Sequence, residues 1–163
     1  FLDFEDQSIE RNFIESLLVA VGSKGTIFAH GAIFEISALQ RLLKKDHFKD
    51  LYDKIIKLID RVVDTKKIAT ENFYSPLMNG SSSIKEVVKA IPGDIVYDKN
   101  DNIAGGTDAT LAWFLYTNPK TSKEEKNELN KNLIEYCSKD TFAIYHLIKY
   151  LLDQKIQTIT KGA

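Results

Sequence analysis

The apolar residues between positions 132 and 149 recur at helical rather than alternating spacing, which predicts one amphipathic helix that faces the core. They are Leu133, Ile134, Cys137, Phe142, Ile144, Tyr145, Leu147 and Ile148. On this helix Tyr136 and Asp140 stand four residues apart, so the phenol and the carboxylate share a face, one turn apart. A carboxylate near the packed side costs free energy unless its charge is compensated, and a metal ion is one such compensation.

The N-terminal part alternates between strand-like and helix-like patterns. The opening FLDFE has a period of two, which is typical of a strand and places Asp3 and Glu5 on one face. A helix is predicted to run through about Val21, and the apolar TIFA at 26–29 predicts a short strand after a glycine-containing turn. Strands that alternate with helices favour a layered α/β domain.

Two more helices are predicted after that strand, from 30 to 45 and from about 47 to 63, and a strand or extended link follows around KKIAT at 66–70. Glu35 lies in the first turn of the 30–45 helix, just beyond the strand end. Because α/β folds place their sites at the ends of strands, Glu35 is a candidate site residue.

The C-terminal part is predicted to consist of loops and helices. A loop with proline, glycine and serine precedes a short helix at 84–91, and an apolar helix is predicted at 108–116. Thr121 with Glu124 three residues later is a predicted capping box that starts the last helical region.

The composition is that of an ordinary globular protein: 163 residues, 44% hydrophobic and 28% charged, which is most simply one domain spanning 1–163. A formal net charge of -1 and a pI near 6.4 exclude a global basic field, so any nucleic-acid binding must be local. The single cysteine, Cys137, excludes an internal disulfide framework and fits a reducing compartment. Since Cys137 belongs to the apolar set of its helix, we expect it to be buried and inert.

No apolar run reaches membrane-spanning length, and no basic-then-apolar signal opens the chain. We therefore expect a cytoplasmic protein with no membrane partner. The first residue is Phe1 rather than Met, which is compatible with a fragment of a longer chain. Other domains of such a chain would then be among its partners.

The candidate carboxylates can be assembled into one site. Asp3 and Glu5 lie on a predicted strand, Glu35 at a strand-to-helix junction and Asp140 on the last helix. Four carboxylates from three elements match what two divalent metals about 4 Å apart require for phosphodiester hydrolysis. Hard oxygen ligands select Mg²⁺ or Mn²⁺, and Tyr136 is placed to orient the attacking water. Each motif alone is also found as a solvated strand face or a surface pair, so the combination carries the hypothesis.

The order of these motifs resembles a known superfamily, the RNase H-like 3'-5' exonucleases with four acidic residues, called DEDD. Its members carry a strand with DxE, a strand and helix reading roughly HNxxFD, and a helix with YxxxD. In this chain FLDFE, AHGAIFE and YCSKD stand in that order. Asp64-Thr65 also lies where many members have Asp-Thr after the second motif.

A closer resemblance is to a bacterial family catalogued as domain of unknown function 2779. It rests on SIKEVV, the Gly-Gly pair before an apolar helix and IEYCSKDTFAIYHL, and covers most of the chain from Ile27 onward. Together the resemblances imply an α/β RNase H-like three-layer fold, a mixed β-sheet flanked by helices. They also imply a nuclease-like site of the tyrosine subclass, in which Asp3, Glu5, Glu35 and Asp140 hold two metal ions.

The chain departs from the superfamily pattern in three places. Glu35 replaces the usual aspartate, and the extra methylene displaces the carboxylate by roughly a bond length in a strict Mg²⁺ geometry. Gly31 stands where an asparagine is usual. Asp3 and Glu35 are thirty-two positions apart, too few for the two strands that normally separate these motifs. Either residues have been lost between Glu5 and Gln7, or FLDFE is a later strand and the true DxE lies upstream.

The other polar and aromatic candidates have mainly structural interpretations. His30 is expected to be a structural residue at a strand end, and His146 a satisfied core histidine rather than a ligand. Lys66 and Lys67 are candidates for a local phosphate groove. The loop aromatics Phe73 and Tyr74 either stack on unpaired bases or anchor the loop by packing.

The sequence thus predicts a metal-dependent 3'-5' exonuclease that acts on single-stranded DNA or RNA by a two-metal mechanism. The alternative is a catalytically degenerate domain that binds nucleic acid or a partner protein, and a third hypothesis is a structural module of a longer chain. If the site is real, the carboxyl groups of Glu35 and Asp140 should lie roughly 4 to 6 Å apart, since each metal–oxygen bond spans about 2.1 Å.

Overall fold

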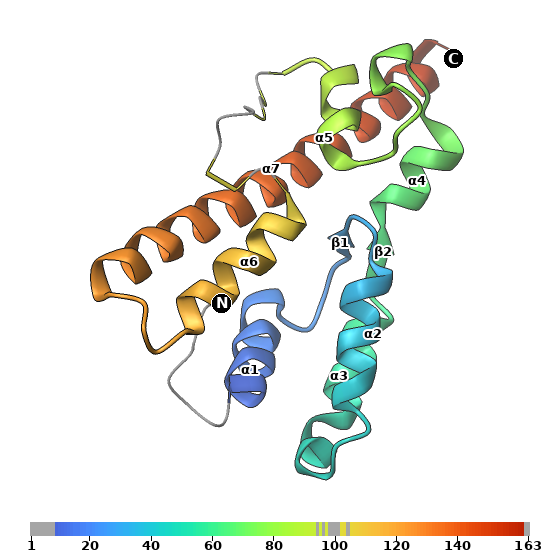
Figure 1. Cartoon of the computed structure of the whole chain (residues 1–163). Helices are drawn as coiled ribbons and strands as arrows, with labels where there is room; N and C mark the ends of the chain where they lie inside the picture. Colours follow the sequence, from blue (N-terminus) through green and yellow to red (C-terminus); the bar gives the residue numbers. More distant parts are fainter. Residues whose placement is uncertain (1–8, 94, 96, 98–101, 104, 162–163) are drawn as a thin grey trace. The chain divides into compact units, whose positions relative to one another are not determined.

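The computed structural model describes residues 9–93, 95, 97, 102–103 and 105–161, and side chains through Gln154 (Figure 1). The chain divides into two compact units, unit 1 at Phe1–Phe73 and unit 2 at Tyr74–Ala163. Each unit has its own buried residues and is described by itself. No helix among the described residues is both long and apolar enough to cross a membrane.

The predicted fold class is wrong. The protein is 71% helical, and its 4% strand forms a sheet of two parallel strands. A three-layer RNase H-like fold with a mixed sheet requires more strands than the described residues form. The predicted FLDFE strand lies outside them, and the predicted extended link KKIAT is helical.

Unit 1 is built around a crossover between two parallel strands (Figure 1). In chain order its elements are α1 (Ile9–Val21), β1 (Ile27–Ala29), α2 (Ile33–Leu42), the 3₁₀ segment η1 (Asp46–Leu51), α3 (Tyr52–Ile59), β2 (Val62–Asp64) and α4 (Thr65–Asn72). Ala29 lies opposite Asp64 in the parallel register. Since parallel strands cannot be joined by a tight turn, α2 and α3 make the connection.

The segment predicted as one helix at 47–63 divides into three elements. The helical part ends at Ile59, and Val62–Asp64 leaves the helix to pair with β1. Asp64 then begins α4, because its side chain accepts hydrogen bonds from the backbone N–H groups of Lys66 and Lys67 as an N-cap. This cap explains why KKIAT forms the first turns of a helix and not an extended link.

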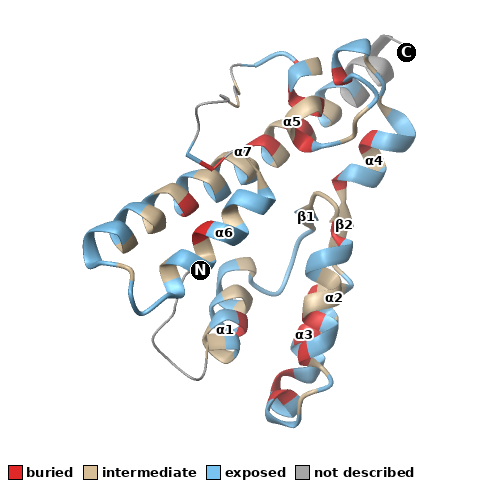
Figure 2. Ribbon diagram, viewed as in Figure 1, coloured by how far each residue is buried: buried red, intermediate tan, exposed pale blue. Residues whose placement is uncertain are grey.

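Apolar packing between α1, α2, η1 and α3 forms the core of unit 1, with buried residues drawn red in Figure 2. Each fully buried aliphatic or aromatic side chain stabilises the fold by roughly 1.5 to 3 kcal/mol. The cluster consists of Ile14, Leu39, Leu42, Phe48, Leu51, Ile55 and Leu58.

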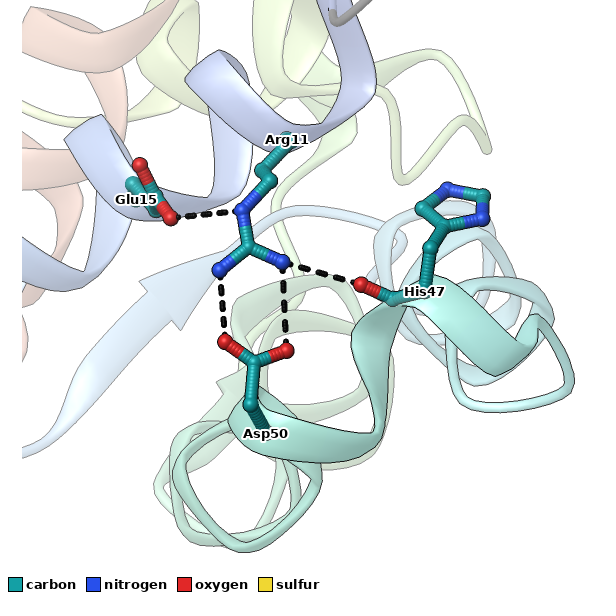
Figure 3. Close-up of polar contacts among 4 residues, drawn as sticks. All are labelled: Arg11, Glu15, His47 and Asp50. Carbon is teal, nitrogen blue, oxygen red and sulfur yellow. Dashed lines mark hydrogen bonds and ion pairs between the residues drawn. The ribbon is translucent and has the colours of Figure 1, made fainter.

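Two arginine side chains connect α1 to the rest of unit 1 through hydrogen bonds. Arg11 forms a two-pronged hydrogen-bonded pair with Asp50, donates to the His47 carbonyl at 2.9 Å and pairs through Nε with Glu15 at 2.9 Å (Figure 3). At the other end of α1, Arg61 donates to the carbonyl oxygens of Val21, Gly22, Lys24 and Gly25. These are carbonyls that a helix end and the following turn leave without intrahelical partners.

Unit 2 packs short helices and α6 against one long helix. Its elements are η2 (Pro76–Met78), α5 (Ile84–Val87), η3 (Val88–Ala90), α6 (Gly106–Thr117) and α7 (Lys123–Lys161). The predicted helix at 132–149 is confirmed as part of α7. Its capping box lies one residue later than predicted: Ser122 and Glu125 exchange hydrogen bonds at 3.0 and 3.2 Å between side chains and backbone N–H groups.

The turn at Pro92 and Gly93 contacts His146 of α7. His146 Nε2 lies 2.6 Å from the Pro92 carbonyl oxygen, so the prediction of a satisfied histidine is confirmed, but the residue is half-buried and not in the core as predicted. Gly93 has φ +149°, and a Cβ added there would lie 2.3 Å from His146 Nε2. Only glycine allows this close approach.

Candidate functional site

Tyr136 and Asp140 lie one turn apart on α7 and are both half-buried, as the sequence predicted. Burial and then the charge of the Asp140 carboxylate, together with a hydrogen bond between the two side chains, raise the pKa of Tyr136 to about 12. The Tyr136 phenol therefore stays protonated over the physiological pH range. At such pH it is a hydrogen-bond donor and not a phenolate base.

Asp140 has a second phenol beside it, which sequence reasoning missed. The Tyr97 hydroxyl donates a hydrogen bond to Asp140 Oδ1 at 2.8 Å from 43 positions earlier in the chain. This bond is charge-assisted if the carboxylate is ionised. A pairing over such a sequence distance leaves no local spacing signal that could have identified Tyr97.

Two lysines lie over the tyrosine rings. Lys85 Nζ is 5.1 Å from the centroid of the Tyr97 ring and 5.2 Å from that of Tyr136, and Lys139 Nζ is 5.7 Å from the Tyr97 ring centroid. These distances are within the range of cation–π attraction. We call Lys85, Tyr97, Tyr136, Lys139 and Asp140 the tyrosine cluster. It combines one carboxylate, two phenols and two ammonium groups within unit 2.

Cys137 does not follow the prediction of burial. It is exposed. Burial of its sulfur by neighbouring atoms and the charge of Asp140 nevertheless raise the thiol pKa above its ordinary value. At neutral pH this disfavours the reactive thiolate.

Glu35 lies in the first turn of α2 and is exposed. It belongs to unit 1, whereas Asp140 belongs to unit 2. The expected separation of their carboxyl groups therefore stays a prediction. Asp3 and Glu5 lie outside the described residues.

Asp64, which the superfamily resemblance had singled out together with Thr65, has a structural role. Its carboxylate accepts backbone N–H groups from Gly31 at 2.9 Å, Ala32 at 3.1 Å and Lys66 at 2.8 Å, with Lys67 more distant at 3.4 Å. Burial alone would raise its pKa, but these donors outweigh burial and lower it. The Asp64 carboxylate thus binds both the backbone that leads into α2 and the first turn of α4.

Thr65 and His30 complete this junction. Thr65 is fully buried and donates its hydroxyl proton to the Ala29 carbonyl at 3.1 Å, while His30 Nδ1 lies 2.9 Å from the same hydroxyl oxygen. Since the hydroxyl has one proton, His30 Nδ1 is the donor in this contact. His30 follows β1 directly, so its expected structural role is confirmed.

The described side chains contain no group of three or more His, Cys, Asp or Glu residues that could hold a metal ion. The hydrogen bonds found at Asp140 are with the phenols of Tyr97 and Tyr136. The expected pair of Mg²⁺ or Mn²⁺ ions therefore stays a prediction.

Comparison with known proteins gives one family. The model of the family described as Domain of unknown function (DUF2779) matches residues 1–83, which is half of the chain. No curated protein and no solved structure matches the chain.

Proposed function

The chain belongs to the DUF2779 family, and from this premise we propose that it is a nuclease of the 3'-5' exonuclease type that acts on single-stranded nucleic acid. The observation that carries the proposal is the setting of Asp140, between two phenols and beside two lysines. Mg²⁺ or Mn²⁺ is the expected cofactor, because phosphodiester hydrolysis with carboxylate ligands uses hard divalent cations.

The tyrosine cluster offers the groups that such a substrate needs. Lys85 and Lys139 supply positive charge for a phosphodiester, and the rings of Tyr97 and Tyr136 are of the kind on which unpaired bases stack. With a pKa of about 12, Tyr136 acts as a neutral donor that orients a water or a phosphate oxygen. Asp140 Oδ1 accepts the Tyr97 hydroxyl through one lone pair and keeps a second one for a new partner.

The test measures hydrolysis and binding separately on the full chain. Cleavage of a labelled single-stranded oligonucleotide is followed with Mn²⁺ or Mg²⁺, and binding is followed by fluorescence anisotropy with a chelator present. Asp140→Asn should abolish cleavage while keeping an acceptor for Tyr97. Tyr136→Phe should lower the cleavage rate by roughly 10²-fold, the usual contribution of a proton-transfer or orienting group.

Matched controls are available on the same helix. Asp153→Asn and Tyr145→Phe change exposed residues of α7 outside the tyrosine cluster, so both should cleave at the wild-type rate. Equal cleavage by the wild type, Asp140→Asn and Tyr136→Phe would refute the assignment of these residues.

A second candidate function is nucleic-acid binding without catalysis. It is favoured by the Tyr97 hydroxyl, which already takes up one lone pair of Asp140 Oδ1. Under this candidate the wild type binds the oligonucleotide, no metal yields cleavage, and Lys85→Gln weakens binding. If the wild type neither binds nor cleaves the oligonucleotide, both candidate functions are refuted.

A further inference from the structure

Unit 1 contains a cavity that the proposed function does not use. It has a volume of about 580 Å³ and lies between the C-terminal half of α1 and the α3 region. Leu18 and Val19 supply its accessible apolar side, while the other apolar lining residues, Leu51 and Leu58, are almost fully buried in the core. Sites for small molecules have volumes of about 300 to 1,000 Å³ and combine apolar walls with a few charged groups, so this cavity has an appropriate size.

The charged side chains around the cavity are mainly positive. Lys54, Lys57 and Arg61 line it, against one carboxylate, Glu15, which pairs with Arg11 at 2.9 Å. Among the described residues, neither lysine has an ion pair within 4.0 Å. The charge of Lys54 does help to lower the pKa of Asp50, whose first partner is Arg11.

The negative end of α1 also borders this cavity and would oppose an anion there. Arg61 removes much of this effect, because its guanidinium donates to four carbonyl oxygens of the helix end and the following turn. The two lysines are therefore left as the charged groups that face an incoming ligand.

We propose that this cavity binds a small amphiphilic anion. The apolar body of the ligand packs on Leu18 and Val19, and its phosphate or carboxylate head lies between Lys54 and Lys57. A ligand with both parts is required, since inorganic phosphate would leave the apolar wall wet and an uncharged alcohol would leave the lysines without a counter-ion.

The experiment is a calorimetric titration of the full chain with decyl phosphate below its micelle concentration, and with decanol, inorganic phosphate and adenosine monophosphate for comparison. One molecule of decyl phosphate should bind per chain, more tightly than the other three. Lys54→Gln and Lys57→Gln should each weaken decyl phosphate binding about fivefold, as expected for a partly exposed ion pair, and leave decanol binding unchanged.

Lys49→Gln is the matched control, because Lys49 is an exposed lysine of unit 1 that pairs with Asp46 and does not line the cavity. It should bind decyl phosphate as the wild type does. Val19→Ser tests the apolar side at a residue that lines the cavity and is 83% exposed, so the fold tolerates the change while binding weakens.

Several results would overturn the proposal: no binding of decyl phosphate, several molecules bound per chain, wild-type affinity in both lysine variants, or tighter binding of adenosine monophosphate or inorganic phosphate. Oligonucleotide cleavage by Lys54→Gln and Lys57→Gln should equal that of the wild type. The inference therefore fails or holds independently of the proposed nuclease activity.

Discussion

At the scale of single residues, the ionised Asp64 carboxylate makes the stability of unit 1 depend on pH. Burial favours its neutral form, but the backbone N–H donors favour the charged form more, and the pKa lies below the ordinary aspartate value. A lowered folded-state pKa gives stabilisation that is complete above the unfolded-state value, near 3.9, and is lost as the pH falls through the folded-state pKa.

Asp64→Asn should therefore lower the free energy of unfolding at neutral pH by about 1 kcal/mol or more, because it removes the charge and its amide nitrogen cannot accept the Ala32 N–H. It should also reduce the further loss of stability on acidification. Urea unfolding measured from about pH 7 to about pH 2 checks both effects. Exposed Asp60 provides the control variant, Asp60→Asn, which should retain the wild-type acid profile. An unchanged acid profile in Asp64→Asn would contradict the assigned role.

Gly93 gives a second prediction at this scale. Gly93→Ala combines an unfavourable φ of +149° with a contact of 2.3 Å to His146, so it should destabilise unit 2 by about 2 kcal/mol or more. Gly106→Ala, at the start of α6 where the added Cβ meets nothing within 4 Å, should be neutral or slightly stabilising. Thermal unfolding of both variants measures this difference, and equal melting temperatures would contradict the close approach of Gly93 to the His146 ring.

At the scale of elements, the sequence predicted those helices and strands that have a strong local pattern. α1, β1, α6 and the central part of α7 lie where their apolar spacing placed them. β2 was missed because Val62 and Val63 continue the apolar set of the preceding helix, and only pairing with β1 makes them a strand. Short apolar runs carry no periodicity that separates the two states.

Arg61, which lies between α3 and β2, uses its planar guanidinium to bind carbonyl oxygens at the end of α1. Arg61→Lys keeps the charge but cannot reach carbonyls in several directions, so unit 1 should lose roughly 1 to 3 kcal/mol. Arg41→Lys, an exposed change in the last turn of α2, is the control and should unfold as the wild type does. Denaturant midpoints of the two variants give the comparison, and a midpoint unchanged in Arg61→Lys would refute the capping role.

At the scale of the whole molecule, the sequence identified the family but not the fold, and the family match covers residues 1–83 rather than the expected stretch from Ile27 onward. The three-layer expectation came from the order of three short motifs, which specifies neither the number of strands nor their pairing. The candidate site was predicted only where it is local. Tyr136 and Asp140 share one helix face, whereas Tyr97 and Lys85 reach them from distant segments that no spacing rule connects.

The hypothesis that Glu35 and Asp140 act on the same metals stays a prediction, and a double-mutant cycle tests it. If both hold one metal pair, Glu35→Gln and Asp140→Asn should each lower the cleavage rate to the same residual level, and the double variant should be no slower than either alone. Independent effects that multiply would contradict a shared site. The exposed Glu71→Gln, in α4, serves as the control for Glu35→Gln.

The Asp64 carboxylate connects parts of the chain that are far apart in sequence. It accepts hydrogen bonds from the amides of Gly31 and Ala32, 33 and 32 positions earlier, and it also caps the start of α4, which follows it. The amide protons of Gly31 and Ala32 can be protected from exchange with solvent only after β2 has reached β1. In the folding reaction, the beginning of α2 and the beginning of α4 should therefore gain their protection in one kinetic step, late rather than early, since the loop between them must close first.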